Sequence, residues 1–443
     1  MSHLFHGLLI NLIRRSDCQS AQPINPSEAE SGHGDLEAVW QQWAQAEMKK
    51  RCVHKNPRKS RSDHRLTASR LALLCFLWDT QHAVLFCQSL CMMAFELRVR
   101  LPCSQPIWEA QTASEWRQQG ANTPPEPQFL TTLKSYLTPS TSRPPALNAL
   151  SRVIILHGLM SIFWDMQRRD QTSLGVIPGE GVNDMDTWRD RISRAYEIWK
   201  IDFDTFCTTL GTRYEGLRDT QSADDSFDPS LLQQAQQELA IFIASYNSVY
   251  HSAQVLLNAD FLDLQIYAGA RHILGRPVQR GDYLRSERVV KEWASADPSS
   301  KQTLCAPKAA WHAAAMLWES SQKLDGFDSA GLFHVPWCLY LATLTCWAFH
   351  HAGSSSGGGM SDMASSEIVW DAKAEMEALL SGMAESRTPR EVAMRQGRER
   401  TGGLVWVMAN ALERVRWGIV HAGVMVLRGL VPWRMINQYG SGI

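Results

Sequence analysis

Cysteine pairs at metal-binding spacing are missing from this chain of 443 residues. None of its ten cysteines begins a Cys-x-x-Cys motif, and no His-x-x-x-His follows at zinc-finger distance. The apolar stretch near the N-terminus is followed by Arg14 and Arg15 rather than preceded by basic residues, so it does not resemble a secretory signal. We therefore expect free, buried thiols in a reducing compartment, with no metal site and no disulfide.

Net charge, phosphate-binding loops and long hydrophobic runs are lacking as well. The 44 Lys and Arg residues balance 45 Asp and Glu residues, so any contact with nucleic acid would need a local basic patch. No Gly-x-x-x-x-Gly-Lys or Gly-x-Gly-x-x-Gly loop precedes a predicted helix. The longest apolar run, Val335 to Phe349, is shorter than the roughly 20 residues that span a bilayer. We expect a buried helix there, no membrane partner and no cofactor.

Alternating strand patterns of useful length are absent, and apolar residues recur at helical spacing instead. The chain is 44% hydrophobic and 20% charged, which is typical of a globular protein, and its 17 tryptophans supply large faces for burial. We predict an all-α fold, a large multi-helix domain. The expected helices lie at 6–14, from Asp35 through Ala44, and at 68–86, 107–118, 147–169, 184–210, 231–257, 261–273, 283–294, 309–324, 335–351 and 404–430.

Proline-rich and glycine-rich segments divide the chain. Prolines cluster between positions 124 and 145, and a Gly/Ser segment runs from Gly353 to Gly359. We therefore predict an N-terminal part at 1–120, a central helical region at 121–352, a flexible segment and linker helix at 353–400, and a C-terminal helix at 401–443.

Two distant stretches carry a more specific pattern, a tryptophan pair on an early helix and an apolar helix late in the chain. Its signature residues are Trp40, Trp43, Glu47, Asp79, Pro336, Trp337, Arg416 and Trp417. With Lys50, Arg51 and the run from Thr80 to Phe86, they resemble the regulatory (middle homology) domain of fungal-specific transcription factors, in the zinc-finger branch. The similarity extends over almost the whole chain. Such domains usually follow a zinc-finger module that contacts DNA.

Two departures from the family pattern stand out. The chain opens at a position that resembles the interior of the family's domain, so we expect that the zinc-finger module and the domain's first helices are missing. Residues from Cys52 to about Arg70 interrupt a junction that the family keeps continuous, and Pro57 would break a helix there. We hypothesise that residues 52–70 are translated intron sequence. A transcript encoding Cys52–Arg70 within the full-length protein would overturn this.

The interruption and the residues before it are basic, with Lys49, Lys50, Arg51, Lys55, Arg58, Lys59, Arg61 and Arg65. Such a run serves nuclear import or phosphate contact in some proteins. A solvated loop is the alternative, because Cys52, Pro57 and Asp63 interrupt the run.

Two further patterns suggest metal chemistry. Asp224, Asp225 and Asp228 fit the Asp-Asp-x-x-Asp magnesium motif of isoprenoid synthases, although Pro229 follows directly and no second metal motif appears downstream. His334, Cys338, Cys346 and His350 recur at helical spacing, but their apolar neighbours favour a core helix over a metal site.

The two signature carboxylates are expected to hold helices together rather than to perform chemistry. Glu47 is spaced to pair with Lys50 or Arg51 one turn later, which contributes little if the pair is exposed. Asp79 lies in an apolar helix and needs a partner if it is buried, and Arg70 and Arg98 are candidates.

The resemblance implies a non-enzymatic, nuclear transcription regulator of a fungal metabolic or secondary-metabolite gene set. Its implied partners are the transcription machinery or co-regulators, a second copy of the chain, and promoter DNA reached indirectly or through the missing zinc-finger segment. Two other interpretations stay open. One is an all-α enzyme that processes isoprenoid diphosphates with Asp224, Asp225 and Asp228, and the other is a remnant gene product without activity.

Overall fold

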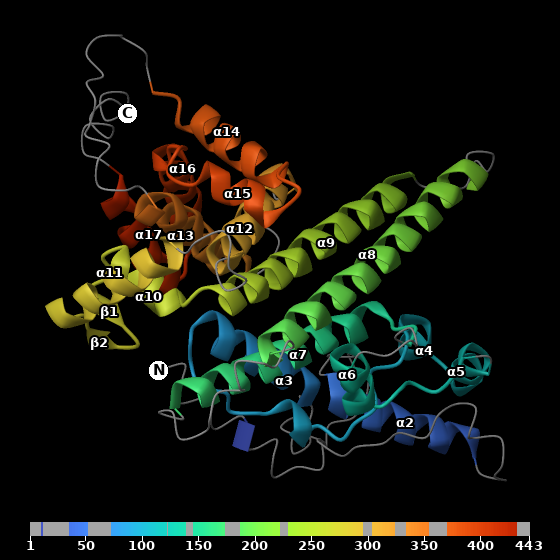
Figure 1. Ribbon diagram of the computed structural model, residues 1–443. Coiled ribbons are helices and arrows are strands. Elements are labelled where there is room, and N and C mark those ends of the chain that lie inside the picture. The colour runs from blue at the N-terminus through green and yellow to red at the C-terminus, as the bar shows by residue number, and fades with distance from the viewer. Residues whose placement is uncertain are drawn as a thin grey trace. The chain divides into compact units, whose positions relative to one another are not determined.

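The computed structural model describes residues 10–11, 35–51, 72–121, 123–138, 145–172, 187–221, 229–295, 304–323, 334–353 and 370–431. Within these ranges the chain is helical apart from loops, one short hairpin and one isolated bridge, which confirms the predicted all-α fold. The chain divides into two compact units, Met1–Phe203 and Asp204–Ile443 (Figure 1). Their common boundary lies inside one helix, α8 (Trp188–Gln221). The domain boundaries expected from the sequence stay predictions.

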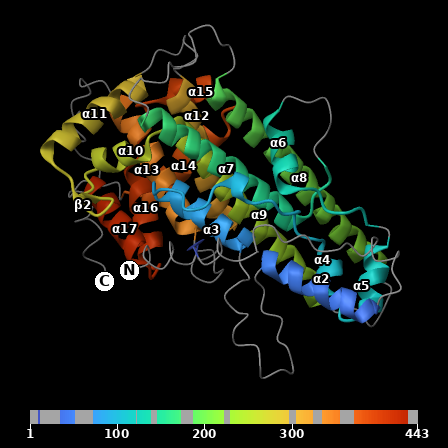
Figure 2. The same cartoon turned by 90° about the horizontal axis from the view of Figure 1, so that it is seen from below.

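The first unit is built around helix α7 (Ala149–Thr172) (Figures 1 and 2). Every residue of α7 from Ser151 to Ser161 is buried, and the helix packs against α3, α6 and the 3-10 helix η3. Helix α2 packs against α3 and α5. The bounds of these elements are α2 (Leu36–Arg51), α3 (Ala72–Leu85), η3 (Ala94–Glu96), α4 (Gln105–Glu109), α5 (Ala113–Gly120) and α6 (Phe129–Leu137).

Close packing of α7 against α6 depends on a glycine. A Cβ atom at Gly158 would lie 2.9 Å from Leu133 Cδ1, closer than side chains tolerate. Within the described residues, α7 is the helix long and apolar enough to span a bilayer, yet 72% of its apolar window is buried inside the protein. That degree of burial is typical of a core helix in a globular unit.

The second unit is centred on helix α13 (Val335–Gly353), in which every residue from Val335 to His350 is buried. The apolar run that the sequence marks as a buried helix is therefore confirmed as one. Helices α9, α10, α11, α12, α16 and α17 pack against α13, and α14 and α15 pack against α12. The bounds are α9 (Pro229–Asn258), α10 (Phe261–Tyr267), α11 (Arg280–Ser295), α12 (Cys305–Lys323), α14 (Ala372–Ala384), α15 (Pro389–Arg395), α16 (Gly402–Glu413) and α17 (Gly418–Leu430).

A β-hairpin joins α10 to α11, where the sequence predicts no strand. Strands β1 (His272–Ile273) and β2 (Arg276–Pro277) are antiparallel, and Ile273 pairs with Arg276. The loop is therefore only Leu274-Gly275, and both residues have positive φ angles, 51° and 80°. A two-residue turn with this geometry is type I′, which usually carries Asn or Gly at its first position. Two-residue strands are too short for an alternating pattern.

Two predicted helices are each divided in the structure. The helix expected at 107–118 consists of α4 and α5, because Thr112 has extended backbone angles and accepts a hydrogen bond from the N–H of Glu115 as the N-cap of α5. The helix expected at 404–430 consists of α16 and α17. Val415 is buried at that bend, and Trp417 has extended backbone angles (φ −113°, ψ 124°).

Candidate functional site

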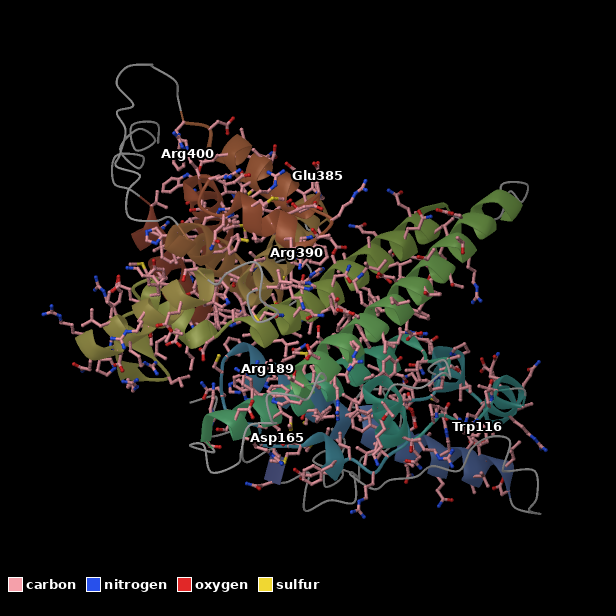
Figure 3. The ribbon with its side chains drawn as sticks, in the orientation of Figure 1. Trp116, Asp165, Arg189, Glu385, Arg390 and Arg400 are labelled. Atoms are coloured by element: carbon pink, nitrogen blue, oxygen red, sulfur yellow. The ribbon has the colours of Figure 1, made fainter. Side chains whose placement is uncertain are left out.

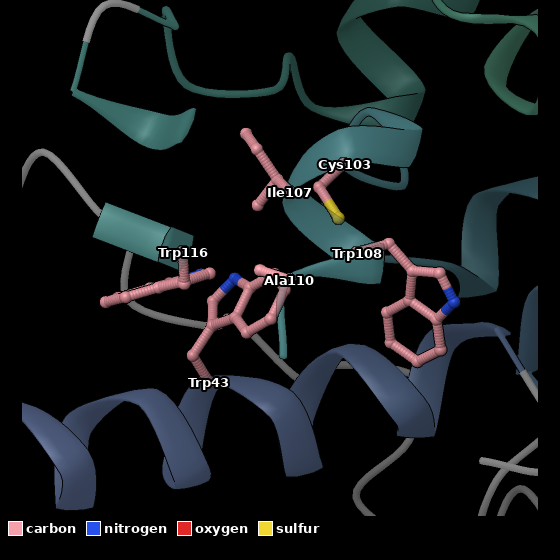
Figure 4. Packing of buried hydrophobic residues seen from close by; sticks show 6 residues of the cluster. All are labelled: Trp43, Cys103, Ile107, Trp108, Ala110 and Trp116. Carbon is pink, nitrogen blue, oxygen red and sulfur yellow. The ribbon is translucent and has the colours of Figure 1, made fainter. Parts of the chain in front are cut away.

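The tryptophan pair of the signature lies in the core of the first unit. Trp43 of α2 is buried, and its ring centroid lies 5.3 Å from that of Trp116 on α5. Figure 4 shows this cluster, in which α2 contacts the segment that contains α4 and α5. Trp40 is partly buried and packs against the same cluster. The cluster consists of Trp43, Cys103, Ile107, Trp108, Ala110 and Trp116.

The second feature is a buried carboxylate on α3. Asp79 is fully buried, and it accepts hydrogen bonds from the backbone N–H groups of Cys91 at 2.9 Å and Met92 at 2.7 Å. Two residues after α3 ends at Leu85, Cys87 adopts a left-handed backbone (φ 55°), and the N–H of Gln88 donates to the carbonyl of Ala83. This turn directs the chain back toward Asp79.

The third feature is a buried carboxylate on α2. Glu47 is only 1% exposed, and its Oε1 accepts a 3.0 Å hydrogen bond from the N–H of Cys103. Asp79 and Glu47 thus bind the two ends of one stretch, residues 91–103, which we call the anchored segment. Hydrogen bonds from backbone N–H groups to a carboxylate are stronger than those between neutral groups.

The partners of these carboxylates differ in part from those expected. The sequence suggests a solvated ion pair for Glu47, but its side chain is buried and binds a backbone amide. For Asp79 the sequence suggests an arginine, whereas the hydrogen bonds described above come from the main chain. Arg98 is exposed, and Arg70 lies outside the described residues. The expectation that both residues hold the fold together agrees with these contacts.

Neighbouring elements hold the anchored segment along its length. The N–H of Leu101 donates to the carbonyl of Pro127 (2.9 Å), and the N–H of Phe129 donates to the carbonyl of Val99 (3.0 Å). Asn148, just before α7, donates from Nδ2 to the carbonyl of Pro102 (2.7 Å). The segment therefore has a fixed path between α2, α3 and the start of α7. Phe95 nevertheless stays 62% exposed.

The sequence patterns do not reveal an ion pair of the same unit that is largely buried, with side chains 7% and 16% exposed. Arg152 on α7 binds Asp202 on α8 with two hydrogen bonds, from Nε at 2.8 Å and from Nη2 at 3.1 Å. The hydroxyl of Tyr136 donates to the same carboxylate, and burial together with the charge of Asp202 raises the pKa of Tyr136 well above its usual value. Trp199 donates to the backbone carbonyl of Arg152. No motif identifies these residues, because they are far apart in the chain.

The late signature residues Pro336 and Trp337 lie in the first turn of α13, where proline is well tolerated. Trp337 is 4% exposed, and its ring contacts those of Phe261 and Tyr340, with centroids 6.1 Å and 4.9 Å away. This pair packs the core of the second unit. Arg416 and Trp417 lie between α16 and α17, Arg416 exposed and Trp417 partly buried as the N-cap residue of α17.

The histidines and cysteines of α13 do not converge on a metal. His334 contacts the hydroxyl of Ser245 at 2.9 Å, whereas His350 contacts the sulfur of Met383 at 3.4 Å. Burial lowers the pKa of each histidine from 6.5 to about 4. It raises the pKa of Cys338 to about 12, and that of Cys346 further. Among the described residues, no group of three or more His, Cys, Asp or Glu side chains is placed to hold a metal ion.

The other candidate residues cannot be placed. Lys49, Lys50 and Arg51 belong to the last turn of α2, and their side chains are not described. The remaining basic residues, Lys55, Arg58, Lys59, Arg61 and Arg65, lie outside the described residues, as do Asp224, Asp225 and Asp228. Nuclear import or phosphate contact by the basic run therefore stays a prediction.

A groove of about 410 Å³ lies on the second unit, between the start of α14 and one side of α16. Trp406 and Val407 supply apolar surface, and Lys373, Asn410 and Arg414 supply polar groups. The groove is open to solvent, unlike pockets that bury most of a small ligand. The described contacts of both units stabilise helices against one another.

Comparison with known proteins relates the first unit to a family of transcription factors. Residues 1–201 match the family model described as "Fungal specific transcription factor domain". The match ends within the last few residues of the first compact unit, Met1–Phe203. The signature carboxylates and the anchored segment all lie inside the matched range.

Two curated relatives extend the similarity over 97% of the chain. The chain is 40% identical over 431 residues to the "Nicotinate catabolism cluster-specific transcription factor" of Emericella nidulans, an alignment that covers 97% of this chain and 43% of that protein. It is 23% identical over 436 residues to the "Zinc finger protein klf1" of Schizosaccharomyces pombe, covering 97% of this chain and 48% of that protein. The chain thus spans less than half the length of these relatives. No solved structure matches it.

Proposed function

We propose that the chain, whose residues 1–201 match the family model of the fungal specific transcription factor domain, acts in the nucleus as the regulatory body of a transcription regulator. The proposal assigns it a non-enzymatic role, in which the helical units bind partners. The observation that carries it is the 40% identity to a fungal transcription factor over 97% of the chain. Nothing in the family match or in the two relatives favours an isoprenoid-processing enzyme.

For the gene set, we propose genes of nicotinate catabolism. The support is the name of the relative that is 40% identical, a transcription factor specific to a nicotinate catabolism cluster. Promoter DNA would be reached through a zinc-finger segment outside this sequence or through a partner protein, and co-regulators or a second copy of the chain would bind the helical units. These partners are part of the proposal.

The test is deletion of the gene, followed by measurement of transcripts during growth on nicotinate as the nitrogen source. Loss of induction of the nicotinate-degrading enzymes, restored by the wild-type gene, would support both parts of the proposal. Changed transcripts in a different gene set would overturn the nicotinate assignment and keep the regulator. An unchanged transcriptome under nicotinate and control conditions would overturn the regulator itself.

A variant links the test to the structure. Asp79→Ala removes the acceptor for two backbone N–H groups of the anchored segment, and it is expected to reduce induction. Glu197→Gln changes an exposed carboxylate of the same unit and is expected to leave induction intact. Protein levels of both variants are compared by immunoblot, so that loss of the protein is distinguished from loss of regulation.

A further inference from the structure

The groove between α14 and α16 has walls that direct contacts hold in place. A Cβ atom at Gly403 would clash with the carbonyl oxygen of Ala372, so α16 begins against the start of α14. Glu375 accepts hydrogen bonds from the N–H of Gly403 (2.8 Å) and from Nε1 of Trp370 (2.9 Å). Figure 1 shows the two helices beside each other. The relative position of the two walls is therefore set by the fold.

One side of α16 lines the groove with three different functional groups. Trp406, Asn410 and Arg414 follow one another at four-residue spacing, and all three line the groove. Arg414 keeps helical backbone angles (φ −71°, ψ −16°), so it continues this stripe beyond the last turn of α16. Trp406 is partly buried, whereas Asn410 and Arg414 are exposed. The wall therefore combines an aromatic ring, an amide and a guanidinium group.

The two polar groups of this stripe are available to a ligand. Asn410 and Arg414 form no hydrogen bond or ion pair with the residues that the structure describes. The carboxylate next to Arg414 in the sequence, Glu413, is paired with Arg428 instead. An amide and a guanidinium group together present several N–H donors. A ligand with acceptor oxygens can satisfy these donors.

The opposite wall adds one cation and one carboxylate. Asp371 is the N-cap of α14, and its Oδ1 accepts a hydrogen bond from the N–H of Ala374. Lys373 lies 3.8 Å from Glu377, and their side chains are 74% and 48% exposed, so this pair is weak. Lys373 and Arg414 against Asp371 give the lining two positive charges and one negative charge, a net charge of +1. This charge favours an anion over a cation.

We propose that the groove binds a small aromatic monocarboxylate, which acts as the effector of the regulator. The ring of the ligand stacks on Trp406, and its carboxylate accepts hydrogen bonds from Asn410 and Arg414. The groove of about 410 Å³ has room for such a molecule, since a cavity of about 150 Å³ holds a benzene ring. Because the groove is open, one edge of the ligand stays in solvent, and a dissociation constant of about 1 mM is expected.

The role as effector rests on the proposed function. The proposed gene set makes nicotinate, a pyridine monocarboxylate, the acid to test. A dissociation constant in the millimolar range lets a regulator respond to a compound that is supplied as a nutrient, and not to traces of it. Binding to the groove is measured on the protein alone, so it can be tested separately from gene regulation.

Binding is tested with the 443-residue chain by titration with nicotinate, followed by saturation-transfer NMR of the ligand. Two further probes separate the ring from the charge. Nicotinamide has the same ring without the carboxylate, and acetate has the carboxylate without the ring. Both are expected to bind at least about fivefold more weakly than nicotinate. Higher salt is expected to weaken the binding of nicotinate and to leave that of nicotinamide unchanged.

Two variants test the polar groups of the groove. Arg414→Gln removes the unpaired cation, and Asn410→Asp places a negative charge beside the carboxylate of the ligand. Each is expected to weaken nicotinate binding about fivefold and to leave the weak binding of nicotinamide unchanged, which a misfolded variant would not do. The matched control is Arg390→Gln, which removes an exposed cation of α15 in the same unit, labelled in Figure 3. It is expected to bind nicotinate as the wild type does.

Three results would overturn the proposal. The first is no binding of nicotinate at millimolar concentrations. The second is equal binding of nicotinamide or of acetate, and the third is wild-type affinity in both the Arg414 and the Asn410 variants. In cells, Arg414→Gln is expected to reduce induction by nicotinate at an unchanged protein level, whereas Arg390→Gln keeps it.

Failure of this proposal and failure of the proposed function give different results. Induction that requires the gene, together with a protein that does not bind nicotinate, would overturn the groove as the effector site and keep the regulator. An unchanged transcriptome after deletion of the gene would overturn the regulator, and with it the role of the ligand as effector.

Discussion

The backbone N–H of Met92 donates a 2.7 Å hydrogen bond to the buried carboxylate of Asp79, which lies 13 positions earlier in the chain. The N–H of Cys91 binds the same carboxylate at 2.9 Å. A buried anion is stable only where donors satisfy it, and here the main chain supplies them. The acidic residue of the family signature is thereby connected to the path of the segment that follows α3.

Replacement of Asp79 measures how much these two hydrogen bonds contribute to stability. Asp79→Ala removes the acceptor for two N–H groups and is expected to lower the free energy of unfolding by about 3 kcal/mol, because buried donors without partners are costly. Asp79→Asn keeps one acceptor oxygen and is expected to cost less. The measurement is urea unfolding followed by circular dichroism. A loss no larger than that of the exposed control Glu197→Gln would contradict the prediction.

For the largely buried pair of Arg152 and Asp202 we predict that the effects of two substitutions are not additive. Asp202→Asn leaves the buried guanidinium of Arg152 without its counter-ion and is expected to cost about 3–5 kcal/mol. The double variant Arg152→Met, Asp202→Leu is expected to recover most of this loss, because it removes both charges.

The control for this cycle is Asp165→Asn, which breaks the ion pair of Asp165 with Arg169, a residue that is 62% exposed. The expected cost is below about 0.5 kcal/mol. Figure 3 labels Asp165 on α7. Equal losses for Asp202→Asn and Asp165→Asn in urea unfolding would show that the Arg152–Asp202 pair contributes no more than an exposed pair.

Because two histidines are buried, we predict that the free energy of unfolding falls in mild acid. His334 and His350 have pKa values of about 4 in the folded protein, against 6.5 for the unfolded chain. Between these values the unfolded chain binds more protons, so stability is fully present above pH 6.5 and is lost as the pH falls toward about 4.

Each of these histidines contributes on the order of 3 kcal/mol to the loss, since one pKa unit corresponds to about 1.4 kcal/mol. The midpoint of urea unfolding, measured across this pH window, is expected to fall with pH. His350→Gln removes one titrating group and is expected to flatten the slope. A midpoint that stays constant from pH 6.5 to about 4 would rule out neutral burial of these residues.

We predict that alanine substitutions at two helix glycines change stability in opposite directions. At Gly158 a Cβ atom would lie 2.9 Å from Leu133 and 3.1 Å from Phe129, so Gly158→Ala is expected to lower stability by about 1–3 kcal/mol through overpacking. At Gly211 of α8 no atom lies within 4 Å of the added Cβ, so Gly211→Ala is expected to raise stability by up to about 1 kcal/mol. Thermal unfolding of both variants checks this, and equal signs would refute it.

The sequence indicates the all-α class and the buried helix at 335–351 because helical periodicity and a continuous apolar run are local properties. It does not indicate the partners of Asp79 and Glu47, since backbone N–H groups carry no residue-specific pattern. The hairpin at 272–277 is missed because its two-residue strands are too short for alternation, and because Leu replaces the Asn that usually signals such a turn.

The residues of the candidate site are likewise only partly predictable from the sequence. The tryptophan pair on α2 is recognised from the sequence, and the structure places Trp43 in the cluster with Trp116. The Arg152–Asp202 pair is missed, because its members lie 50 positions apart and resemble ordinary surface charges in the sequence. The α16–α17 bend is missed because it contains no proline, and its glycine, Gly418, is already the first residue of α17.

The carboxylates at both ends of the anchored segment bind main-chain N–H groups, and this affects which sequence changes the segment can tolerate. Asp79 and Glu47 bind N–H groups that every residue except proline provides, so they constrain the path of residues 91–103 and not their identities. The side chains that this stretch exposes, such as Phe95 and Arg98, are consequently free to change between relatives. New contacts can evolve at these exposed positions while the path is kept, provided that no proline enters where a main-chain N–H is bound, as at Cys91, Met92, Leu101 and Cys103.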